Sequence, residues 1–481
     1  MNYKVIFYTV GRIMQFEAIF FLPPFIISIA YGEVFTAFSF AVSAIIALAA
    51  WLLLSHFVGK NDKLIYAREG FAIVALAWIA ISAVGAIPYV ISGEIPNYID
   101  AFFETVSGFT TTAASVIENV EELGKGIMFW RSFTHWLGGM GVLVFMMAIF
   151  PQESGRSIHI MRAEMAGPTM GKLVPKLRET ARILYLIYIV MTVLETLILW
   201  AMGMPPYEAL LHAFGTSGTS GFAIKSDSLA GYSTEIQWVI SVFMIFGGIN
   251  FNLFYLVFVR RFRDVFKSME LWVYFAIIAV CTALVAINIS SLYGGFWETV
   301  RYAFFHVSAI ITTTGYSLCD YSTWPDFSKT LLLILMFVGG CAGSTAGGIK
   351  ISRFIIAFKS IVRDIKQMLH PAAVSGVRYE GKKLDDKTIH GVNAYFTFYF
   401  IVFFIGLLLI SFEPFGFETN FSAVSACFNN IGAGFGAVGP YGNYAAYSAF
   451  GKIVLSALML LGRLEIFPLL LVFTPIFWKS K

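Results

Sequence analysis

The chain has 481 residues, of which 58% are hydrophobic, 17% aromatic and 13% charged. Because soluble domains carry about a quarter charged residues, this composition excludes an ordinary soluble protein and indicates a chain that crosses a membrane many times. The net charge of +4 is small, so the distribution of the basic residues is more informative than their number.

Apolar segments of spanning length follow one another along the chain, and we expect about ten spans. They cover roughly residues 5–30, 37–57, 71–92, 127–150, 182–203, 235–259, 270–289, 328–369 (interrupted), 390–412 and 451–477. The first segment follows Lys4 without a small-residue cleavage site, so we expect it to be retained. Lys and Arg gather in alternate connections, and the positive-inside rule then predicts that both termini are cytoplasmic.

Four polar stretches of small residues recur between these spans at intervals of about a hundred residues, which suits a repeated membrane module. Their centres are loop 1 (Thr111, Thr112, Ala113), loop 2 (Thr219, Ser220, Gly221), loop 3 (Thr313, Thr314, Gly315) and loop 4 (Asn430, Ile431, Gly432). Each loop follows a short apolar segment, at 98–107, 207–215, 297–310 and 418–428. Such segments are too short to cross a bilayer and indicate re-entrant half-helices. Four loops of this kind around one axis would replace the hydration shell of a cation.

The predicted fold class is therefore an all-α polytopic membrane protein. Four repeats of span, re-entrant half-helix, filter loop and span would surround one pore, preceded by two N-terminal helices. The predicted units are residues 1–70 (the two N-terminal helices), 71–180, 181–268, 269–388 and 389–481 (the four pore repeats).

The interrupted segment at 328–369 carries five glycines within ten residues: Gly339, Gly340, Gly343, Gly347 and Gly348. Each glycine costs a helix about 1 kcal/mol relative to alanine, so the pattern predicts a break. A small-residue packing face is the alternative. The density of glycines favours an unwound, mobile constriction below the loops.

Arg463 lies within the last apolar segment, where a charged side chain is a functional candidate by default. An ion pair with Glu465 is the structural alternative. A fixed positive charge ~4 Å from a permeating cation would cost about 4 kcal/mol at an effective dielectric constant near 20, which makes Arg463 a candidate barrier.

Other polar residues in apolar segments are interpreted more simply. We expect Glu104, His135, Glu195, His212 and His306 to be packing partners rather than proton carriers. Arg131 and Arg301 are expected to extend towards the outer surface. The four cysteines (Cys281, Cys319, Cys341, Cys427) show neither paired nor metal-ligand spacing.

Two nucleotide-like motifs are rejected. Gly434–Gly439 fits G-x-G-x-x-G without a surrounding βαβ unit, and Gly343–Lys350 resembles a P-loop but has Gly-Ile-Lys where Gly-Lys-Ser/Thr is required. No Ser-His-Asp set or paired histidine cluster is present either, so we predict that the chain is not an enzyme and binds no organic cofactor.

Several of these stretches together resemble the Trk/Ktr/HKT superfamily of potassium transporters, and its bacterial TrkH branch above all. They are Thr110–Ala114, Trp136–Gly141, Thr312–Tyr316, Gly339–Lys350, Asn429–Gly434 and Gly462–Phe467, and the resemblance covers nearly the whole chain.

The resemblance implies a channel-like potassium uptake subunit of the bacterial inner membrane. Filter carbonyls from the four loops would bind K⁺, the transported ion and the only metal expected. Gly339–Gly348 would be the intramembrane gating loop, with Arg463 facing it. The resemblance also implies a homodimer and a cytoplasmic nucleotide-binding regulatory subunit of the TrkA type. The basic segments 152–182 and 350–388 are candidate docking surfaces.

One residue departs from the family pattern: Ala113 stands where the other three loops have glycine. In plant relatives a first-loop residue other than glycine accompanies sodium transport. A chain that passes both K⁺ and Na⁺, or a Na⁺-coupled transporter, is therefore the alternative. A methyl group also disfavours a positive φ angle, so a slight distortion of loop 1 is expected.

Overall fold

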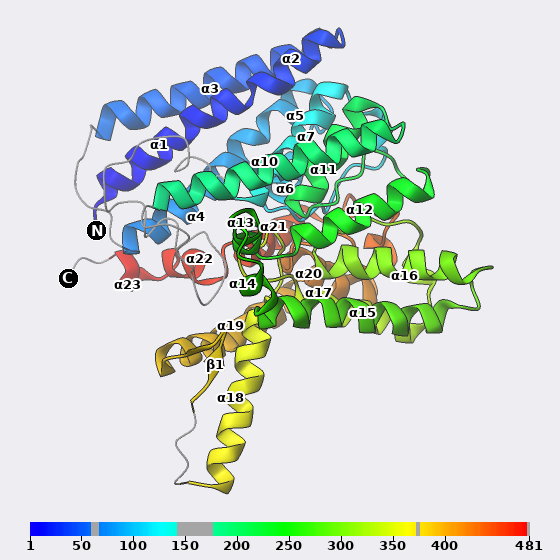
Figure 1. The fold of residues 1–481 in the computed structure, drawn as a ribbon. Coiled ribbons are helices and arrows are strands. Elements are labelled where there is room, and N and C mark those ends of the chain that lie inside the picture. The colour runs from blue at the N-terminus through cyan, green and yellow to red at the C-terminus, as the bar shows by residue number, and fades with distance from the viewer. Residues whose placement is uncertain (59–66, 142–176, 372–375, 479–481) are drawn as a thin grey trace.

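The computed structural model describes residues 1–58, 67–141, 177–371 and 376–478 (Figure 1). Within these residues all regular secondary structure is helical except for one short antiparallel hairpin, in which β1 (Arg378–Tyr379) pairs with β2 (Lys382–Lys383). The expected all-α class is thus correct apart from this hairpin. The candidate docking segment 152–182 lies largely outside the described residues.

The N-terminal helices are α1 (Tyr3–Phe20), α2 (Leu22–Ala30) and α3 (Val34–Val58). Helix α1 packs along α3, and the chain bends at Phe21, just before two consecutive prolines. The two ends of the chain meet, because the ring of Tyr3 stacks on that of Trp478 with centroids 5.8 Å apart.

The remaining helices are described in four successive groups, each of which contains one short helix that precedes one of the four loops. The first is α4 (Ala67–Gly85), α5 (Ile87–Ser92), α6 (Tyr98–Phe109), η1 (Val120–Glu122) and α7 (Lys125–Gly139). The second is α10 (Leu177–Ala201), α11 (Pro206–Gly218), α12 (Thr234–Gly247), α13 (Phe251–Phe258) and α14 (Phe262–Phe266). The third is α15 (Met269–Ile289), α16 (Phe296–Ile311), η2 (Tyr321–Thr323), α17 (Asp326–Val338) and α18 (Ile351–Leu369). The fourth is α19 (Asp386–Ile410), α20 (Phe417–Phe428), η3 (Gly436–Val438), α21 (Ala449–Arg463), α22 (Phe467–Val472) and α23 (Pro475–Trp478).

Helices α6, α11, α16 and α20 occupy the four segments expected to be half-helices, and each is followed by one of the four loops. Most of their residues are buried, including the whole last turn of each. The exact boundaries of the predicted units stay predictions.

Six of the described helical segments are long and apolar enough to cross a membrane: Tyr3–Ala30, Val34–His56, Arg68–Ser92, Glu179–Ala201, Met269–Ile289 and Asp386–Ile410. The chain is therefore a multi-pass membrane protein, although the count of about ten spans stays a prediction. The apolar segment expected at 235–259 is present but bent, because α12 and α13 meet at 96°. A side chain at Gly247 or Gly248 would overlap Thr219 or Tyr274, and Asn250 caps α13 by accepting a hydrogen bond from the Asn252 amide at 2.9 Å.

The apolar segment expected at 451–477 is also interrupted. Helix α21 ends at Arg463, and the next helix begins only after Glu465 and Ile466, whose φ angles are 55° and 67°. The left-handed region is energetically unfavourable for residues with a Cβ atom. These two φ angles therefore interrupt the helix in a strained conformation. This break places Arg463 at the C-terminal end of a helix.

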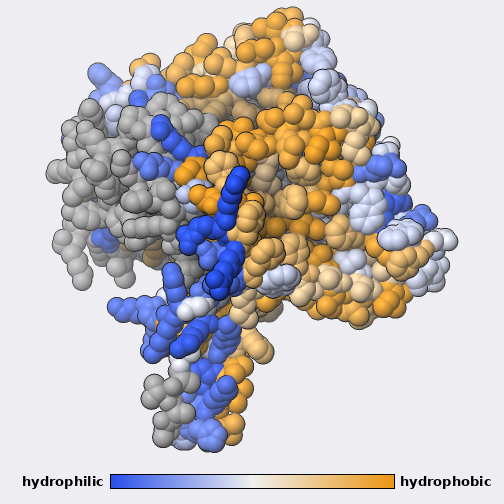
Figure 2. Space-filling model, viewed as in Figure 1, coloured by the Kyte–Doolittle hydropathy of each residue, from blue (hydrophilic) through white to orange (hydrophobic). Residues whose placement is uncertain are grey.

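Helix α18 and the β-hairpin project from the main body (Figure 1). One side of this projection is hydrophobic and the other hydrophilic (Figure 2). The apolar side carries Phe358, Ile361, Ile365 and Met368, each more than half exposed.

Candidate functional site

All four half-helices end in the same backbone motif. The first residue of each loop is left-handed, with φ of 57° at Thr111, 52° at Thr219, 56° at Thr313 and 56° at Asn430. Its amide donates to the carbonyl three positions back, and the following amide donates to the carbonyl five positions back, at 2.8–3.3 Å. These pairs are Thr111–Gly108 and Thr112–Ser107, Thr219–Thr216 and Ser220–Gly215, Thr313–Ile310 and Thr314–Ala309, and Asn430–Cys427 and Ile431–Ala426. This is a Schellman closure, which satisfies the last helical carbonyls and turns the chain sharply.

The third residue of three loops packs directly against the next loop. A Cβ atom on Gly221 would overlap the carbonyl oxygen of Thr314, in loop 3. One on Gly315 would overlap the carbonyl oxygen of Ile431, in loop 4, and one on Gly432 that of Thr112, in loop 1. In each case the carbonyl belongs to the second residue of the neighbouring loop. The loops therefore follow one another in chain order with a repeated contact that only glycine permits.

The third residues of all four loops line one cavity of about 120 Å³, hereafter the outer cavity. Gly439, from the rejected G-x-G-x-x-G motif, also lines it. Ala113 is left-handed, with φ of 65°, as are Gly315 at 80° and Gly432 at 85°, whereas Gly221 does not have a positive φ angle. The distortion expected in loop 1 is thus confined to a modest change of φ, with the Schellman hydrogen bonds intact.

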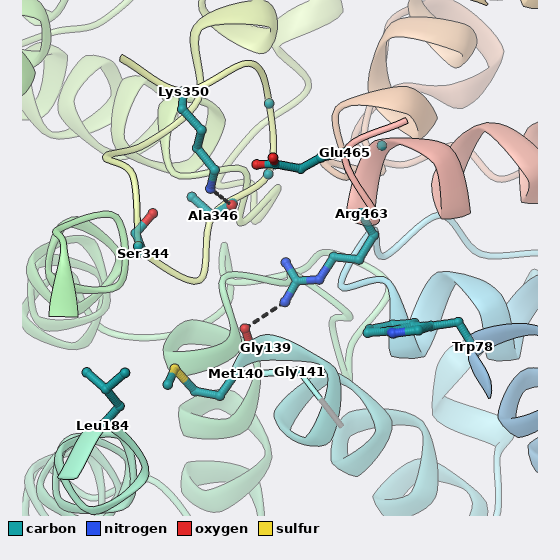
Figure 3. A pocket seen from close by; sticks show the side chains of 14 residues that line it. Trp78, Gly139, Met140, Gly141, Leu184, Ser344, Ala346, Lys350, Arg463 and Glu465 are labelled. Atoms are coloured by element: carbon teal, nitrogen blue, oxygen red, sulfur yellow. Dashed lines mark hydrogen bonds between the residues drawn. The ribbon is translucent and has the colours of Figure 1, made fainter. Parts of the chain in front are cut away.

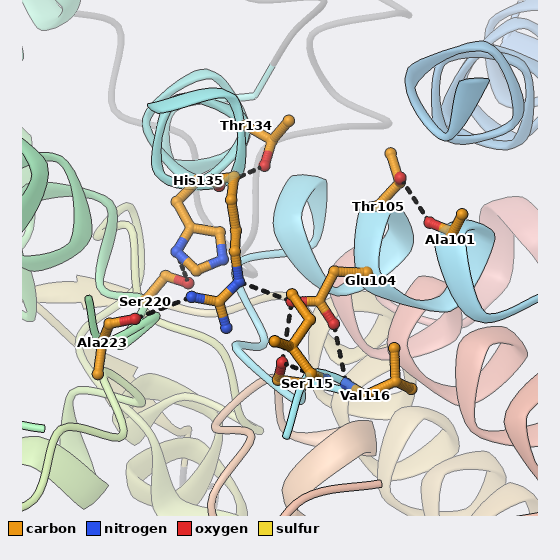
Figure 4. A network of polar contacts seen from close by, with 11 residues as sticks. Ala101, Glu104, Thr105, Ser115, Val116, Thr134, His135, Ser220 and Ala223 are labelled. Carbon is orange, nitrogen blue, oxygen red and sulfur yellow. Dashed lines mark hydrogen bonds and ion pairs between the residues drawn. The ribbon is translucent and has the colours of Figure 1, made fainter. Parts of the chain in front are cut away.

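A buried ion pair joins loop 1 to loop 2 (Figure 4). The Nε atom of Arg131 donates to Glu104 at 2.7 Å, and its Nη1 atom donates to the Ala223 carbonyl at 2.9 Å. Glu104 also accepts from the Val116 amide at 2.9 Å and from the Ser115 hydroxyl at 3.0 Å. The expectation that Arg131 extends to the outer surface is therefore wrong, because a buried carboxylate holds it inside, where it is 2% exposed.

Other side chains tie neighbouring loops together from behind. His135 contacts the Ser220 hydroxyl at 2.5 Å, and His212 contacts the Tyr316 hydroxyl at 3.3 Å, as expected of packing partners. The amide of the Asn430 side chain donates to the Thr112 hydroxyl at 3.0 Å. These bonds cross-link the ring without using its backbone carbonyls.

The predicted break between α17 and α18 is confirmed. The glycine-rich loop, Gly339–Lys350, separates the two helices, and three of its glycines have positive φ angles: Gly339 (71°), Gly343 (74°) and Gly348 (73°). Ala or any larger residue would be strained at these positions. The small-residue packing face within a continuous helix is thereby excluded.

The glycine-rich loop packs against the C-terminal ends of the half-helices and the loops that follow them. The Gly347 amide donates to the Thr313 hydroxyl at 2.6 Å, and the Thr345 hydroxyl donates to the Ser217 carbonyl at 3.2 Å. A Cβ atom on Gly347 would overlap the Asn429 carbonyl oxygen. Since the outer cavity lies at the opposite ends of the same loops, the glycine-rich loop and the outer cavity lie on opposite sides of the ring.

Arg463 reaches from the end of α21 to the glycine-rich loop (Figure 3). Its guanidinium group donates to the carbonyl of Thr345 at 2.9 Å and to those of Gly138 and Gly139, at the end of α7, at 2.5 and 2.6 Å. Glu465, its proposed ion-pair partner, instead accepts from Arg353 at 2.5 Å. A cation at the C-terminal end of a helix is favoured by the helix dipole.

Below the loop lies a second cavity, of about 60 Å³, lined by Gly343, Gly347, Gly348, Gly139 and Arg463 among others (Figure 3). The third residues of the four loops therefore line the outer cavity, whereas Gly343, Gly347, Gly348 and Arg463 line this second cavity. Three participants were not singled out as site residues from the sequence: Thr345, the Gly138 carbonyl and the Glu104–Arg131 pair. Among the described residues, no group of three or more His, Cys, Asp or Glu could hold a metal ion.

Comparison with known proteins agrees over the whole length. The family model described as "TrkH: Cation transport protein" matches residues 33–480. The Trk system potassium uptake proteins TrkH of Salmonella typhimurium and of Escherichia coli K12 are 35% and 34% identical to the chain, with 100% of each chain covered. The crystal structure of the potassium transporter TrkH from Vibrio parahaemolyticus superposes with a TM-score of 0.88 at 30% identity, again with 100% of both chains covered.

The buried pair behind loops 1 and 2 gives a test of stability. In Arg131→Ala the Glu104 carboxylate would remain buried without its cation, so we expect the free energy of unfolding to fall by about 3–5 kcal/mol. The measurement is the apparent melting temperature in detergent. Arg261→Ala is the matched control, because its partner Asp264 lies in an exposed pair at 2.8 Å that contributes about 0–1 kcal/mol. Equal shifts in the two variants would contradict the assignment.

Proposed function

The chain belongs to the TrkH family of cation transport proteins, and we propose that it carries K⁺ into the cell through the ring of four loops. The observation that supports this proposal is the repeated left-handed turn after all four half-helices, together with the one cavity that the third residues of the loops line. Backbone carbonyls of the loops, with the Thr and Ser hydroxyls, would replace the hydration shell of the ion. The uptake of potassium by relatives that match the chain from end to end supports the choice of ion.

The proposed K⁺ ligands are the residues of loops 1 to 4 as defined from the sequence. The C-terminal ends of α6, α11, α16 and α20 point their negative dipole ends towards the ring, which favours a cation there. A secondary symporter with two broken helices in inverted repeats is less well supported, because the same turn recurs after four half-helices rather than after two.

We assign the gate to the glycine-rich loop and Arg463. The loop is bonded to loop 3 through the Gly347 amide, and the guanidinium group holds it through the Thr345 carbonyl. A positive charge ~4 Å from the ion path opposes a cation by about 4 kcal/mol. Movement of the loop away from Arg463 and Thr313 would open the path.

Ala113 makes mixed K⁺ and Na⁺ permeation the alternative. Ala113 carries a methyl group where each of the other three loops has a glycine that packs closely against a neighbouring loop. A wider junction between loops 1 and 2 would relax the fit of the ring around the larger ion.

In this proposal the protein lies in the bacterial inner membrane, with both termini in the cytoplasm. A second copy of the chain covers the apolar side of α18, since Phe358, Ile361, Ile365 and Met368 extend beyond the body that could shelter them. A regulatory nucleotide-binding subunit of the TrkA type binds the cytoplasmic face.

The dimer is tested by the substitution Ile361→Glu, which should convert the detergent-solubilised protein from dimer to monomer. The measurement is the molecular mass by light scattering, and an unchanged mass would contradict this dimer.

The transport proposal is tested with purified protein in liposomes. We expect K⁺ or Rb⁺ flux, and a reversal potential in mixed K⁺ and Na⁺ that favours K⁺. In Ala113→Gly the preference for K⁺ should rise about fivefold, because a left-handed alanine carries ~1 kcal/mol of strain. Absence of flux with every nucleotide and partner condition would overturn the proposal. An unchanged reversal potential in Ala113→Gly would remove residue 113 from selectivity.

The gate assignment is tested by substitution of Arg463. We expect Arg463→Ala to raise the basal K⁺ flux about tenfold or more, since both the positive charge and the bonds to the loop are lost. Arg463→Lys keeps the charge and loses the planar set of donors, so it separates the two contributions. If the basal flux of Arg463→Ala equals that of the native protein, the gate assignment is wrong and Arg463 has a structural role only.

A further inference from the structure

Glu270 is a buried carboxylate that the transport proposal does not use. It is the second residue of α15 and is 4% exposed. Three hydrogen-bond donors converge on its side chain: the amides of Ala342 and Ser352 and the hydroxyl of Tyr379.

Two of these donors are backbone amides, one within the glycine-rich loop and one just after it. The Oε1 atom accepts from the amide of Ala342, near the start of the loop, at 2.7 Å, and from the amide of Ser352, just beyond its end, at 3.0 Å. Ser352 lies in the first turn of α18, whose amides lack helical partners. One carboxylate from α15 thus caps α18 and clamps both ends of the loop, with bonds strengthened by its charge.

The third donor comes from the β-hairpin. The hydroxyl of Tyr379, in β1, donates to the Oε2 atom of Glu270 at 3.0 Å, and Tyr379 is 4% exposed. The next residue, Glu380, accepts from the Ser268 hydroxyl and from the Glu270 amide, both at 3.1 Å. The hairpin therefore holds both the side chain and the backbone at the start of α15.

The hairpin is also attached to α18, because the Lys359 ammonium group donates to the Arg378 carbonyl at 2.9 Å. Its outer residues Arg378, Lys382 and Lys383 are exposed. A ligand that binds this basic surface would reach the hairpin without entering the membrane, and the hairpin contacts the clamp directly.

We propose that Glu270 is the positioning residue of the glycine-rich loop and that the β-hairpin sets its hold through Tyr379. Displacement of the hairpin withdraws the Tyr379 hydroxyl and the Glu380 carboxylate, which loosens Glu270 and frees the amides of Ala342 and Ser352. The loop is then released from both ends. This inference deepens the proposed function, since it rests on the glycine-rich loop being the gate.

The chain contains its own reporter of the loop. Cys341, which precedes Ala342, is 1% exposed. Cys281 and Cys427 are also buried, in α15 and α20, whereas Cys319 is partly exposed. A water-soluble maleimide should therefore label Cys341 only when the loop is released, and Cys281 and Cys427 only when the protein loosens as a whole. Labelling of Cys319 shows that the reagent is active.

The experiment follows the labelling of each cysteine peptide by mass spectrometry, in the full-length protein. In Tyr379→Phe we expect Cys341 to react about tenfold faster, because a hydrogen bond to a charged acceptor is lost. In Glu270→Gln the rise should be at least as large. Trp272→Phe is the matched control: it removes a bond from the Trp272 indole to the Phe266 carbonyl, 2.9 Å long, in the same turn of α15, and should leave Cys341 protected.

Unchanged labelling of Cys341 in both variants would overturn the proposal, as would equal increases at Cys341 and Cys427. K⁺ flux of the same variants separates this inference from the transport proposal. Faster labelling with higher basal flux supports both. Faster labelling with unchanged flux supports the positioning role of Glu270 and contradicts the gate.

Discussion

The close contact between neighbouring loops is the constraint on which the rest of the structure depends. At Gly221, Gly315 and Gly432 the backbone of one loop touches a carbonyl of the next with no room for a Cβ atom. Such contacts require a fixed position and orientation of each loop relative to its neighbour. The Schellman closure determines the orientation of the loop, and the buried half-helix determines its position. Side-chain hydrogen bonds of His135, His212 and Asn430 also connect neighbouring loops. These three bonds do not use the backbone carbonyls of the loops.

The buried charges near the four loops are each stabilised by a helix dipole or by an opposite charge. Arg463 ends α21 and takes carbonyls as partners, whereas Glu270 lies at the start of α15 and takes amides from the start of α18. Each charge thus lies at the helix end whose dipole favours it. Glu104 and Arg131 neutralise each other behind the ring. Because an unpaired charge in an apolar interior is very costly, these arrangements fix the ends of helices that the glycine-rich breaks would otherwise leave free.

Much of this organisation could be predicted from the sequence, because the half-helices and loops are local features. The length of each apolar segment, the polar triplet after it and the density of glycines at 339–348 depend only on neighbouring residues. The breaks at Gly248–Asn250 and after Arg463 were not predicted, because a long apolar run does not show where another element requires the helix to end. Partners distant in the chain, such as Glu270 with Tyr379 or Glu465 with Arg353, left no signal in a single sequence. The orientation of Arg131 was missed for the same reason, since Glu104 lies on a different helix.

Ring and glycine-rich loop are also joined to each other, and this limits how either can move. The Gly347 amide is bonded to the hydroxyl of Thr313, a loop residue whose own backbone is left-handed. Gly347 also lies against the Asn429 carbonyl, at the start of loop 4. A displacement of the glycine-rich loop therefore breaks a hydrogen bond to loop 3 and removes the packing beneath loop 4 in the same step. The Thr313 hydroxyl then loses the donor that the Gly347 amide supplies. The glycine-rich loop and loop 3 are therefore coupled, because one hydrogen bond belongs to both.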